Sequence, residues 1–197
     1  MITLYHRPKS RSTRFLWLLE ELGAPYRIQE VTTRTREGGA PDPANPHPHG
    51  KVPAISDDGE VVWESPAIAL YLTDRYPTAG IGPAIGDPKR GAYVSWLVYY
   101  GSVLEPALMS KFMNTPVPVG TAGWVELDGV MAHIVKTLSA GPYLLGDKFS
   151  AADILYATTF AMFGAMPIFP KSPVIDAYVK RCLERPAYKR AQEKEAA

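Results

Sequence analysis

Residues 63–67 read WESPA and combine an anion site with a neighbouring carboxylate. Ser65 followed by Pro66 predicts a helix start, because serine is a preferred N-cap and proline suits the first helical position. The first N–H groups of a helix lack internal partners and the helix dipole is positive there, so such a start can bind a carboxylate. Glu64, just before it, can receive an ammonium group. The pair suits the zwitterionic end of an amino acid; the alternative for Ser65 alone is a plain structural cap.

Residues 8–14, PKSRSTR, place two serines and three basic residues between the apolar runs MITLY and FLWLLEELG. The stretch lies where a strand over Ile2–Tyr5 ends and a helix begins. Ser12 is the expected N-cap of that helix, and Lys9, Arg11 and Arg14 are expected to make its mouth electropositive.

The elements around these residues alternate between strand and helix up to residue 76. The helix after PKSRSTR ends at Gly23, where a C-terminal cap is expected, and a strand follows over Tyr26–Val31. Residues 36–50, REGGAPDPANPHPHG, predict a surface loop with room for one short helix. VPAIS and EVVWE, joined by DDG, predict a hairpin, and SPAIALYLTDRY predicts a helix. This βαβ–ββα order over 1–76 is the layout of a thioredoxin-like α/β domain.

Pro53 follows Val52 at the entry to the third strand. Proline has no donor for a sheet ladder, so it belongs at a strand start, an edge or a cis turn. A trans proline opening the strand is the simpler interpretation. A cis proline here would instead leave the backbone of Val52 free to bond an extended peptide ligand.

The remainder of the chain reads as a linker over 77–87 and an all-helical domain over 88–197. The expected helices cover roughly 88–112, 121–139, 150–166, 173–184 and 187–195. The most apolar segment, Ile154–Phe169, is too short to span a bilayer and predicts a buried helix. Ser150 and Asp153 predict a capping box at its start, with a stabilising and not a catalytic role.

Composition narrows the class of partner. With 21 basic and 20 acidic residues among 197, the net charge of +1 does not favour nucleic acid or a membrane surface, so a small-molecule partner is expected. One cysteine, Cys182, cannot form an internal disulfide, and the start lacks a signal-peptide pattern, so a cytoplasmic location is expected. His47 and His49 lack further ligands at a recognised spacing, so no metal is expected.

Five segments together resemble the cytosolic glutathione transferases in order and spacing: SRSTRFLWLLEELG, HGKVPAI, WESPAIALYL, GPYLLGDKFSAADI and RPAYKRA. The resemblance covers almost the whole chain. It implies a thioredoxin-like domain that binds glutathione, a helical domain that supplies a pocket for a hydrophobic electrophile, and a homodimer. That pocket is expected to include Tyr99, Tyr100, Met109 and Phe112, although such stripes are more often core.

The resemblance also assigns the glutathione contacts. Val52, before Pro53, would pair through its backbone with the cysteinyl part, Glu64 and Ser65 would hold the γ-glutamyl end, and Lys51 and His49 could reach the glycine carboxylate. The text HPHGKVP departs from the family pattern, since His47 stands where many members have asparagine.

Three hydroxyls compete to activate the glutathione thiol. Ser10 stands where serine-type members place their hydroxyl, Tyr5 where tyrosine-type members place theirs, and Ser12 is the third; Ser10 is favoured. No cysteine lies in positions 9–14, which argues against dithiol exchange. The expected reaction is addition of glutathione to small electrophiles, with hydroperoxide reduction as a side activity. A non-catalytic glutathione-binding or interaction module with the same fold is the alternative.

Overall fold

The computed structural model describes residues 1–33, 40, 42–118 and 120–196. The predicted loop over 36–50 therefore lies partly outside the described residues, and its described part, 42–50, forms turns and bends. The chain divides into two compact units, one formed by Met1–Gly80 with Glu184–Ala197 and the other by Ile81–Leu183.

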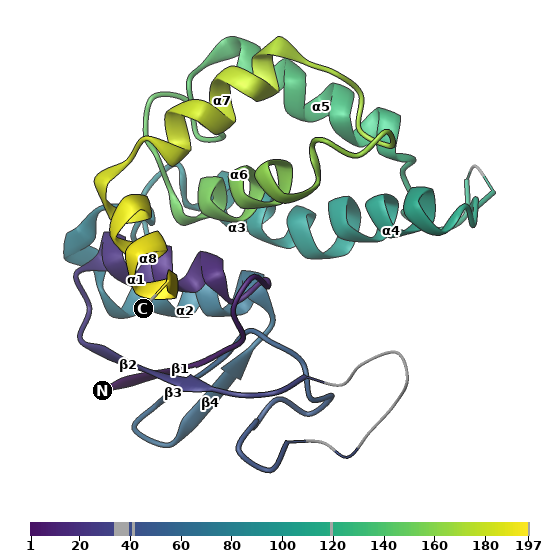
Figure 1. Ribbon diagram of the computed structural model, residues 1–197. Coiled ribbons are helices and arrows are strands. Elements are labelled where there is room, and N and C mark those ends of the chain that lie inside the picture. The colour runs from purple at the N-terminus through teal and green to yellow at the C-terminus, as the bar shows by residue number, and fades with distance from the viewer. Residues whose placement is uncertain (34–39, 41, 119, 197) are drawn as a thin grey trace. The chain divides into compact units, whose positions relative to one another are not determined.

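The first unit contains a four-stranded mixed sheet with the strand order β2-β1-β3-β4 (Figure 1). β1 pairs parallel with β2 and antiparallel with β3, and β3 pairs antiparallel with β4. Asp58 and Gly59 form the hairpin turn with φ values of 49° and 97°, as the Asp-Gly signal predicts. The strands are β1 Ile2–His6, β2 Tyr26–Glu30, β3 Ala54–Asp57 and β4 Glu60–Trp63.

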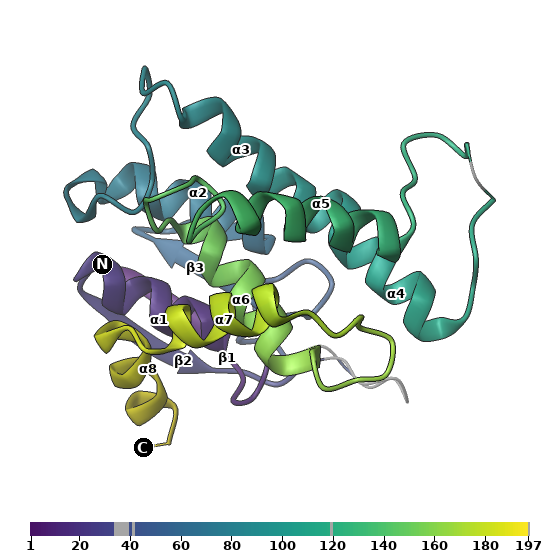
Figure 2. The same ribbon diagram turned by 90° about the horizontal axis from the view of Figure 1, so that it is seen from above.

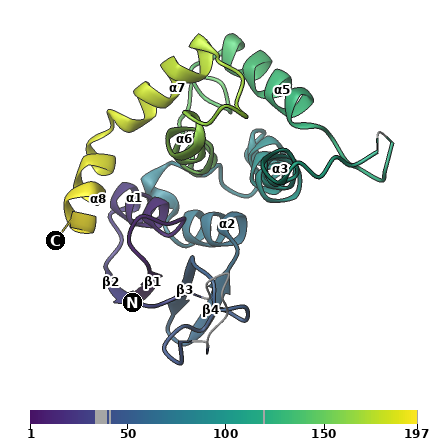
Figure 3. The ribbon, with the colours of Figure 1, turned by 45° about the vertical axis from the view of Figure 1, so that its right-hand side comes forward.

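Helices α1 (Thr13–Leu22) and α2 (Ser65–Arg75) lie over one face of this sheet (Figure 3). Apolar side chains of α1 and alternate residues of β1 are fully buried and form the core of the unit, because successive strand residues point to opposite faces: Ile2, Leu4, Phe15, Leu16 and Leu19. Gly23 ends α1 at a φ of 61°, and its N–H bonds the Leu19 carbonyl, as expected for a glycine C-cap.

The last helix, α8 (Pro186–Ala196), packs against α1 within the same unit (Figure 1). The Trp17 and Tyr188 rings meet edge to face at 5.0 Å. Arg185 binds Glu21 with two hydrogen bonds of 2.5 and 2.8 Å. The sequence analysis groups this helix with residues 88–197, whereas its packing partner is α1. Such a long-range pairing has no local signal in the sequence.

The second unit is all helical, as predicted. α3 (Arg90–Tyr99), a π-helical turn (Tyr100–Leu104) and α4 (Glu105–Met113) form one continuous rod (Figure 2). In the π turn the N–H of Glu105 bonds the carbonyl of Tyr100, five residues back. Pro106 follows directly and has no N–H to continue the α-helical ladder, which accounts for the wider turn here. The other helices are α5 Leu127–Ala140, α6 Ala151–Phe163 and α7 Pro173–Leu183.

Helix α6 is buried on nearly all sides and forms the centre of the helical unit. At its start, Ser150 and Asp153 form a capping box in which the Ser150 N–H bonds the Asp153 carboxylate at 2.8 Å. This carboxylate also accepts the Leu144 N–H at 3.0 Å, which ties the preceding loop to the helix. Across the described residues, none of the helices has both the length and the apolar character that crossing a bilayer would require.

Candidate functional site

The strand register gathers three polar segments at one edge of the sheet. Tyr5 pairs with Ala54, and Ala54 pairs with Trp63. The loop after β1, the residues before β3 and the start of α2 must therefore follow side by side. These segments hold the predicted hydroxyls, the Val52–Pro53 peptide and the Glu64–Ser65 helix start.

The loop between β1 and α1 holds Ser10, which is half-buried. Its Oγ donates to the Arg7 carbonyl at 2.6 Å and lies 2.8 Å from the Oγ of Ser12. The backbone N–H of Ser12 also donates to the Ser10 Oγ at 3.2 Å. Three contacts within the loop thus position this hydroxyl while leaving the residue partly exposed, as a group that meets a ligand needs to be.

Ser12 stands at the N-cap position of α1, but its side chain makes no capping hydrogen bond. The prediction that it is a plain cap is wrong, because the buried Oγ turns back toward the strand. It lies 2.8 Å from Nδ1 of His6 and accepts the Arg7 N–H at 3.1 Å. Ser12 is fully buried, so its side chain does not face solvent.

Tyr5 points to the other face of the sheet from His6, since neighbouring residues of a strand alternate. Its hydroxyl lies 3.4 Å from the Oγ of Ser56 on β3. The ring is half-buried. This orientation directs the Tyr5 hydroxyl away from the Ser10 loop, because His6 is the residue that contacts that loop.

The start of α2 carries an unusual backbone. Glu64 is the N-cap, with φ 69° and ψ 125°, and Ser65 is the first helical residue. Non-glycine residues rarely adopt positive φ, and such strain gathers at ligand sites. The Ile68 N–H bonds the Glu64 carbonyl, which leaves the N–H groups of Ser65 and Ala67 ahead of the first helical bond. Glu64 is exposed and Ser65 is 6% exposed.

The peptide bond between Val52 and Pro53 is cis. Among the described residues, neither the N–H nor the C=O of Val52 has a hydrogen-bond partner. Lys51, just before it, is exposed, and its carbonyl accepts the side-chain amide of Asn45 at 3.1 Å. The backbone of Val52 is thus available to an extended ligand.

His47, which replaces the usual asparagine of the family pattern, is buried and has a structural role. Its Nδ1 accepts the N–H of His49 at 3.1 Å, which holds the exposed His49 in place. Burial lowers the pKa of His47, while the nearby Glu64 carboxylate acts in the opposite direction. Across the described residues, His, Cys, Asp and Glu side chains form no group of three that could hold a metal.

The three basic residues of PKSRSTR do not together form one positively charged surface at the start of α1. Lys9 is exposed with a φ of 55°, and Arg11 is half-buried. Arg14 is only 1% exposed, which corrects the sequence-based expectation. Its position in the first turn places it on the buried side of α1, where a charge does not face a ligand from solvent.

In the helical unit, the four residues expected to line a hydrophobic pocket occupy different surroundings. Tyr100 is fully buried, with its hydroxyl 2.8 Å from that of Thr159, so it packs in the core. Tyr99 lines a 370 Å³ hollow on α3 with Val94 and Val98. Met109 and Phe112 are 39% and 47% exposed on α4.

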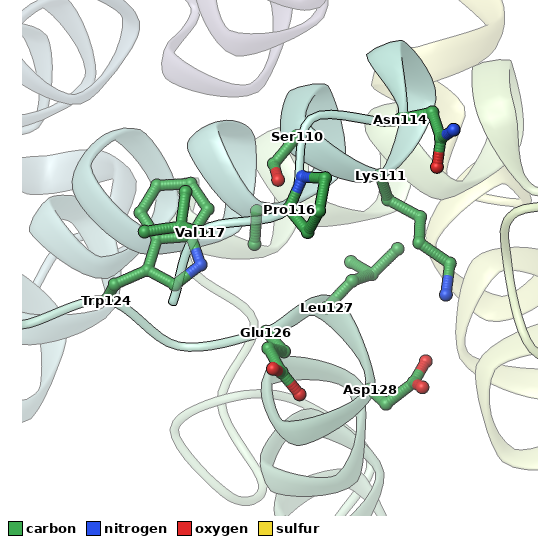
Figure 4. Close-up of a pocket in the computed structure, with 10 residues that line it drawn as sticks. Ser110, Lys111, Asn114, Pro116, Val117, Trp124, Glu126, Leu127 and Asp128 are labelled. Carbon is green, nitrogen blue, oxygen red and sulfur yellow. The ribbon is translucent and has the colours of Figure 1, made fainter. Parts of the chain in front are cut away.

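A pocket of about 310 Å³ lies between the end of α4 and the start of α5 (Figure 4). None of the four residues lines it. Its walls combine apolar side chains with the charged groups of Lys111, Glu126 and Asp128. It is a mixed polar hollow inside the helical unit.

Two residues of the site were missed by the sequence analysis. His6 ends β1 and is 2% exposed, and the carboxylate of Glu195, on α8, accepts the backbone N–H of Lys9 at 2.7 Å. Lys9 and Glu195 are 186 residues apart in the chain, so no local pattern could indicate their contact.

The fold and the site define a thioredoxin-like domain with a cis proline directly before β3, followed in the chain by an all-helical domain. Two family models match the chain: the glutathione S-transferase N-terminal domain over residues 1–74 and the glutathione S-transferase C-terminal domain over residues 118–181. A rice protein named probable glutathione S-transferase GSTF2 is 30% identical over 178 residues, which cover 84% of this chain and 80% of that protein. The chain belongs to the glutathione S-transferase family.

Solved structures agree with this assignment. A glutathione transferase from Methylococcus capsulatus has a TM-score of 0.81 and 28% identity, covering 100% of this chain and 99% of its own. A sphingomonad glutathione S-transferase complexed with glutathione has a TM-score of 0.75 and 28% identity, with 98% of both chains covered.

Proposed function

We propose that this chain binds glutathione at the edge of the sheet described above and adds its thiolate to small hydrophobic electrophiles. The observation that carries the proposal is the strand register. It places the Ser10 loop, the backbone of Val52 and the Glu64–Ser65 helix start along one edge. These are the three features that a thiol-containing tripeptide requires. The relatives with glutathione bound support the choice of ligand.

In this proposal the free N–H and C=O of Val52 pair with the cysteinyl backbone, as an added strand would. Ser65 and the N–H groups at the start of α2 bind the γ-glutamyl carboxylate, and Glu64 receives its ammonium group. Lys51 and His49 are both exposed beside Val52 and are suited to the glycine carboxylate.

Ser10 is the proposed donor to the thiolate. A thiol with a pKa of about 8.5 is a few per cent ionised at pH 7, and lowering it by about two units takes roughly 2.7 kcal/mol. A hydrogen bond to a charged group contributes about 1.5–3 kcal/mol and a helix start about 0.3–1 kcal/mol. A hydrogen bond from Ser10, together with the start of α1, is therefore sufficient in magnitude to lower the thiol pKa by that amount. Tyr5, directed to the other face, and buried Ser12 are weaker alternatives.

The electrophile pocket is proposed to involve the half-buried Tyr99 and the exposed Met109 and Phe112. Hydroperoxide reduction is proposed as a side activity, and a homodimer as the functional assembly. Both follow from family membership.

Ultraviolet titration of the bound glutathione thiolate tests the proposal. Ser10→Ala should raise the thiol pKa by about one to two units, because a hydrogen bond of about 1.5–3 kcal/mol is lost. Ser139→Ala, an exposed hydroxyl on α5, serves as the matched control and should leave the pKa unchanged. A pKa within a few tenths of wild type in Ser10→Ala would make the assignment wrong, and a larger shift in Tyr5→Phe would move the role there.

Retention on immobilised glutathione and turnover of a general aromatic electrophile separate the enzyme from the binding module. Retention with turnover supports the transferase. Retention without turnover, unaffected by Ser10→Ala, supports a non-catalytic module. No retention would contradict both.

A further inference from the structure

Ser10 is connected to the protein interior by a line of polar side chains in contact with one another. Donation of a hydrogen bond to the thiolate would need only Ser10. The Oγ atoms of Ser10 and Ser12 are 2.8 Å apart, and the Oγ of Ser12 is 2.8 Å from Nδ1 of His6. Nε2 of His6 in turn lies 3.8 Å from Oε1 of Glu195. The line runs from the half-buried Ser10 through two buried residues to a carboxylate on the C-terminal helix.

His6 is unusual because it is 2% exposed and one of its ring nitrogens lacks a hydrogen bond. Among the described residues, Nε2 has no hydrogen-bond partner, and the carboxylate of Glu195 lies 3.8 Å from it. A buried polar nitrogen without a partner carries a free-energy cost, which suggests a role beyond packing.

Glu195 is held in this position. Its Oε1 accepts the N–H of Lys9, in the loop before α1, at 2.7 Å and the hydroxyl of Thr13, the first residue of α1. A fixed carboxylate beside Nε2 favours the tautomer with the proton on Nε2. Nδ1 is then an acceptor, and the Ser12 hydroxyl donates to it. The Arg7 carbonyl lies 2.6 Å from the Oγ of Ser10 and 3.2 Å from that of Ser12, so it competes for both hydroxyl protons. The line forms in the rotamer in which the Ser10 hydroxyl turns from the Arg7 carbonyl and donates to the Oγ of Ser12, 2.8 Å away.

We propose that His6 accepts the proton of the glutathione thiol through Ser12 and Ser10, and that Glu195 stabilises the resulting imidazolium. This inference rests on the proposed function. His6 and Glu195 do not touch the substrate, so they are positioning residues that act through the two serines.

The proton shifts along the line balance. The thiol proton passes to the Oγ of Ser10, the Ser10 proton to the Oγ of Ser12, and the Ser12 proton to Nδ1 of His6. One S–H bond breaks and one N–H bond forms, and no proton leaves the protein. Every hydrogen bond in the line is now reversed, so Ser10 donates to the thiolate. A neutral thiol and imidazole have become a thiolate and an imidazolium.

The surroundings of His6 suit a base that is neutral at rest. Burial lowers the pKa of His6, while Glu195 on α8 and Glu30 on β2 act in the opposite direction. A neutral imidazole can accept a proton, and two nearby carboxylates favour the charged form once the proton arrives.

The test compares thiolate formation with proton release when glutathione binds the full-length protein. Thiolate is followed by ultraviolet absorbance, and proton release by an indicator dye in weak buffer. The variants are Glu195→Gln and His6→Asn, in which asparagine keeps a polar atom near Nδ1. Glu193→Gln, an exposed carboxylate on the same helix, is the matched control. S-methylglutathione, which has no thiol proton, reports binding alone.

We expect wild type and Glu193→Gln to form more thiolate than the protons they release. Glu195→Gln and His6→Asn should raise the thiol pKa by about one unit, which is a tenfold loss of thiolate well below that pKa. They should also release one proton per thiolate formed and bind S-methylglutathione as wild type does.

Equal proton release and thiolate formation in wild type, or an unchanged thiol pKa in Glu195→Gln, would overturn the relay and leave the glutathione transferase proposal intact. Weaker binding of S-methylglutathione in parallel with the pKa shift would make the effect structural and also overturn it. Failure of wild type to bind glutathione would remove the proposed function itself.

Discussion

Asp153 at the start of α6 offers a sharp test of what holds the helical unit together. It is completely buried, and its carboxylate accepts four hydrogen bonds of 2.8–3.0 Å. The donors are the N–H groups of Leu144 and Ser150 and the hydroxyls of Ser150 and Tyr178. The substitution Asp153→Ala removes the acceptor for all of them at once.

The two backbone N–H groups cannot rotate to new partners, so each is left unsatisfied at about 1–3 kcal/mol. Asp153→Ala should therefore lower the free energy of unfolding by about 2–6 kcal/mol. Ser150→Ala keeps both N–H bonds to the carboxylate and should cost only about 0.5–2 kcal/mol. Tyr178→Phe removes one hydroxyl donor to a charged group, worth about 1.5–3 kcal/mol.

Urea unfolding followed by far-ultraviolet circular dichroism measures all three variants. Asp153→Ala should be the most destabilising of them. A loss below about 1 kcal/mol, or a larger loss in Ser150→Ala, would show that water or a rearranged loop replaces the carboxylate.

Three further predictions follow from burial and charge. Burial raises the pKa of Asp153 to about 6, above its unfolded value of about 3.9, so the folded state holds its extra proton more tightly. Urea unfolding at a series of pH values measures the free energy of unfolding of wild type relative to Asp153→Asn. This difference should fall by about 3 kcal/mol as the pH rises from about 4 to about 6. A difference that does not change with pH would contradict the prediction. Arg185→Met should lower the free energy of unfolding by about 1–3 kcal/mol, because the Glu21 side chain, 8% exposed, loses a partner that makes two hydrogen bonds to it. Substitution of Arg190, whose side chain is 50% exposed, by methionine should lower it by under about 1 kcal/mol. Equal losses in the two variants would contradict this difference. Cys182 is fully buried, so a thiol reagent should label it only on unfolding, and rapid labelling in native buffer would be inconsistent with this position.

Local patterns predicted the elements of this chain well. The Asp-Gly turn, the Gly23 helix end and the alternation of apolar residues act within a few positions, so the sequence displays them directly. The strand after α1 and the helices of the second unit were predicted on the same basis. Some boundaries were wrong: the helix expected to begin at residue 121 begins at Leu127, and Ser65, expected as the N-cap, follows the Glu64 N-cap.

The candidate site was predicted only in part. The types and order of residues indicated a ligand edge with Ser10, Val52 and Ser65. The strained backbone of Glu64 had no signal, because positive φ at a glutamate is imposed by the strand and helix that meet there. The side chain of Ser12 was misjudged, since an N-cap serine and a serine bonded to a strand histidine look the same in sequence.

By itself the sequence determined the two-part fold, the family and the set of competing hydroxyls, because those depend on short-range pattern and on motif order. Only the tertiary structure decided how each of those hydroxyls is oriented and which residues lie behind it. Because successive strand residues point to opposite faces of the sheet, Tyr5 and His6 lie on different faces. The packing of α8 on α1 places Glu195 beside His6. Contacts between residues far apart in the chain depend on how whole elements pack, and no local pattern records that.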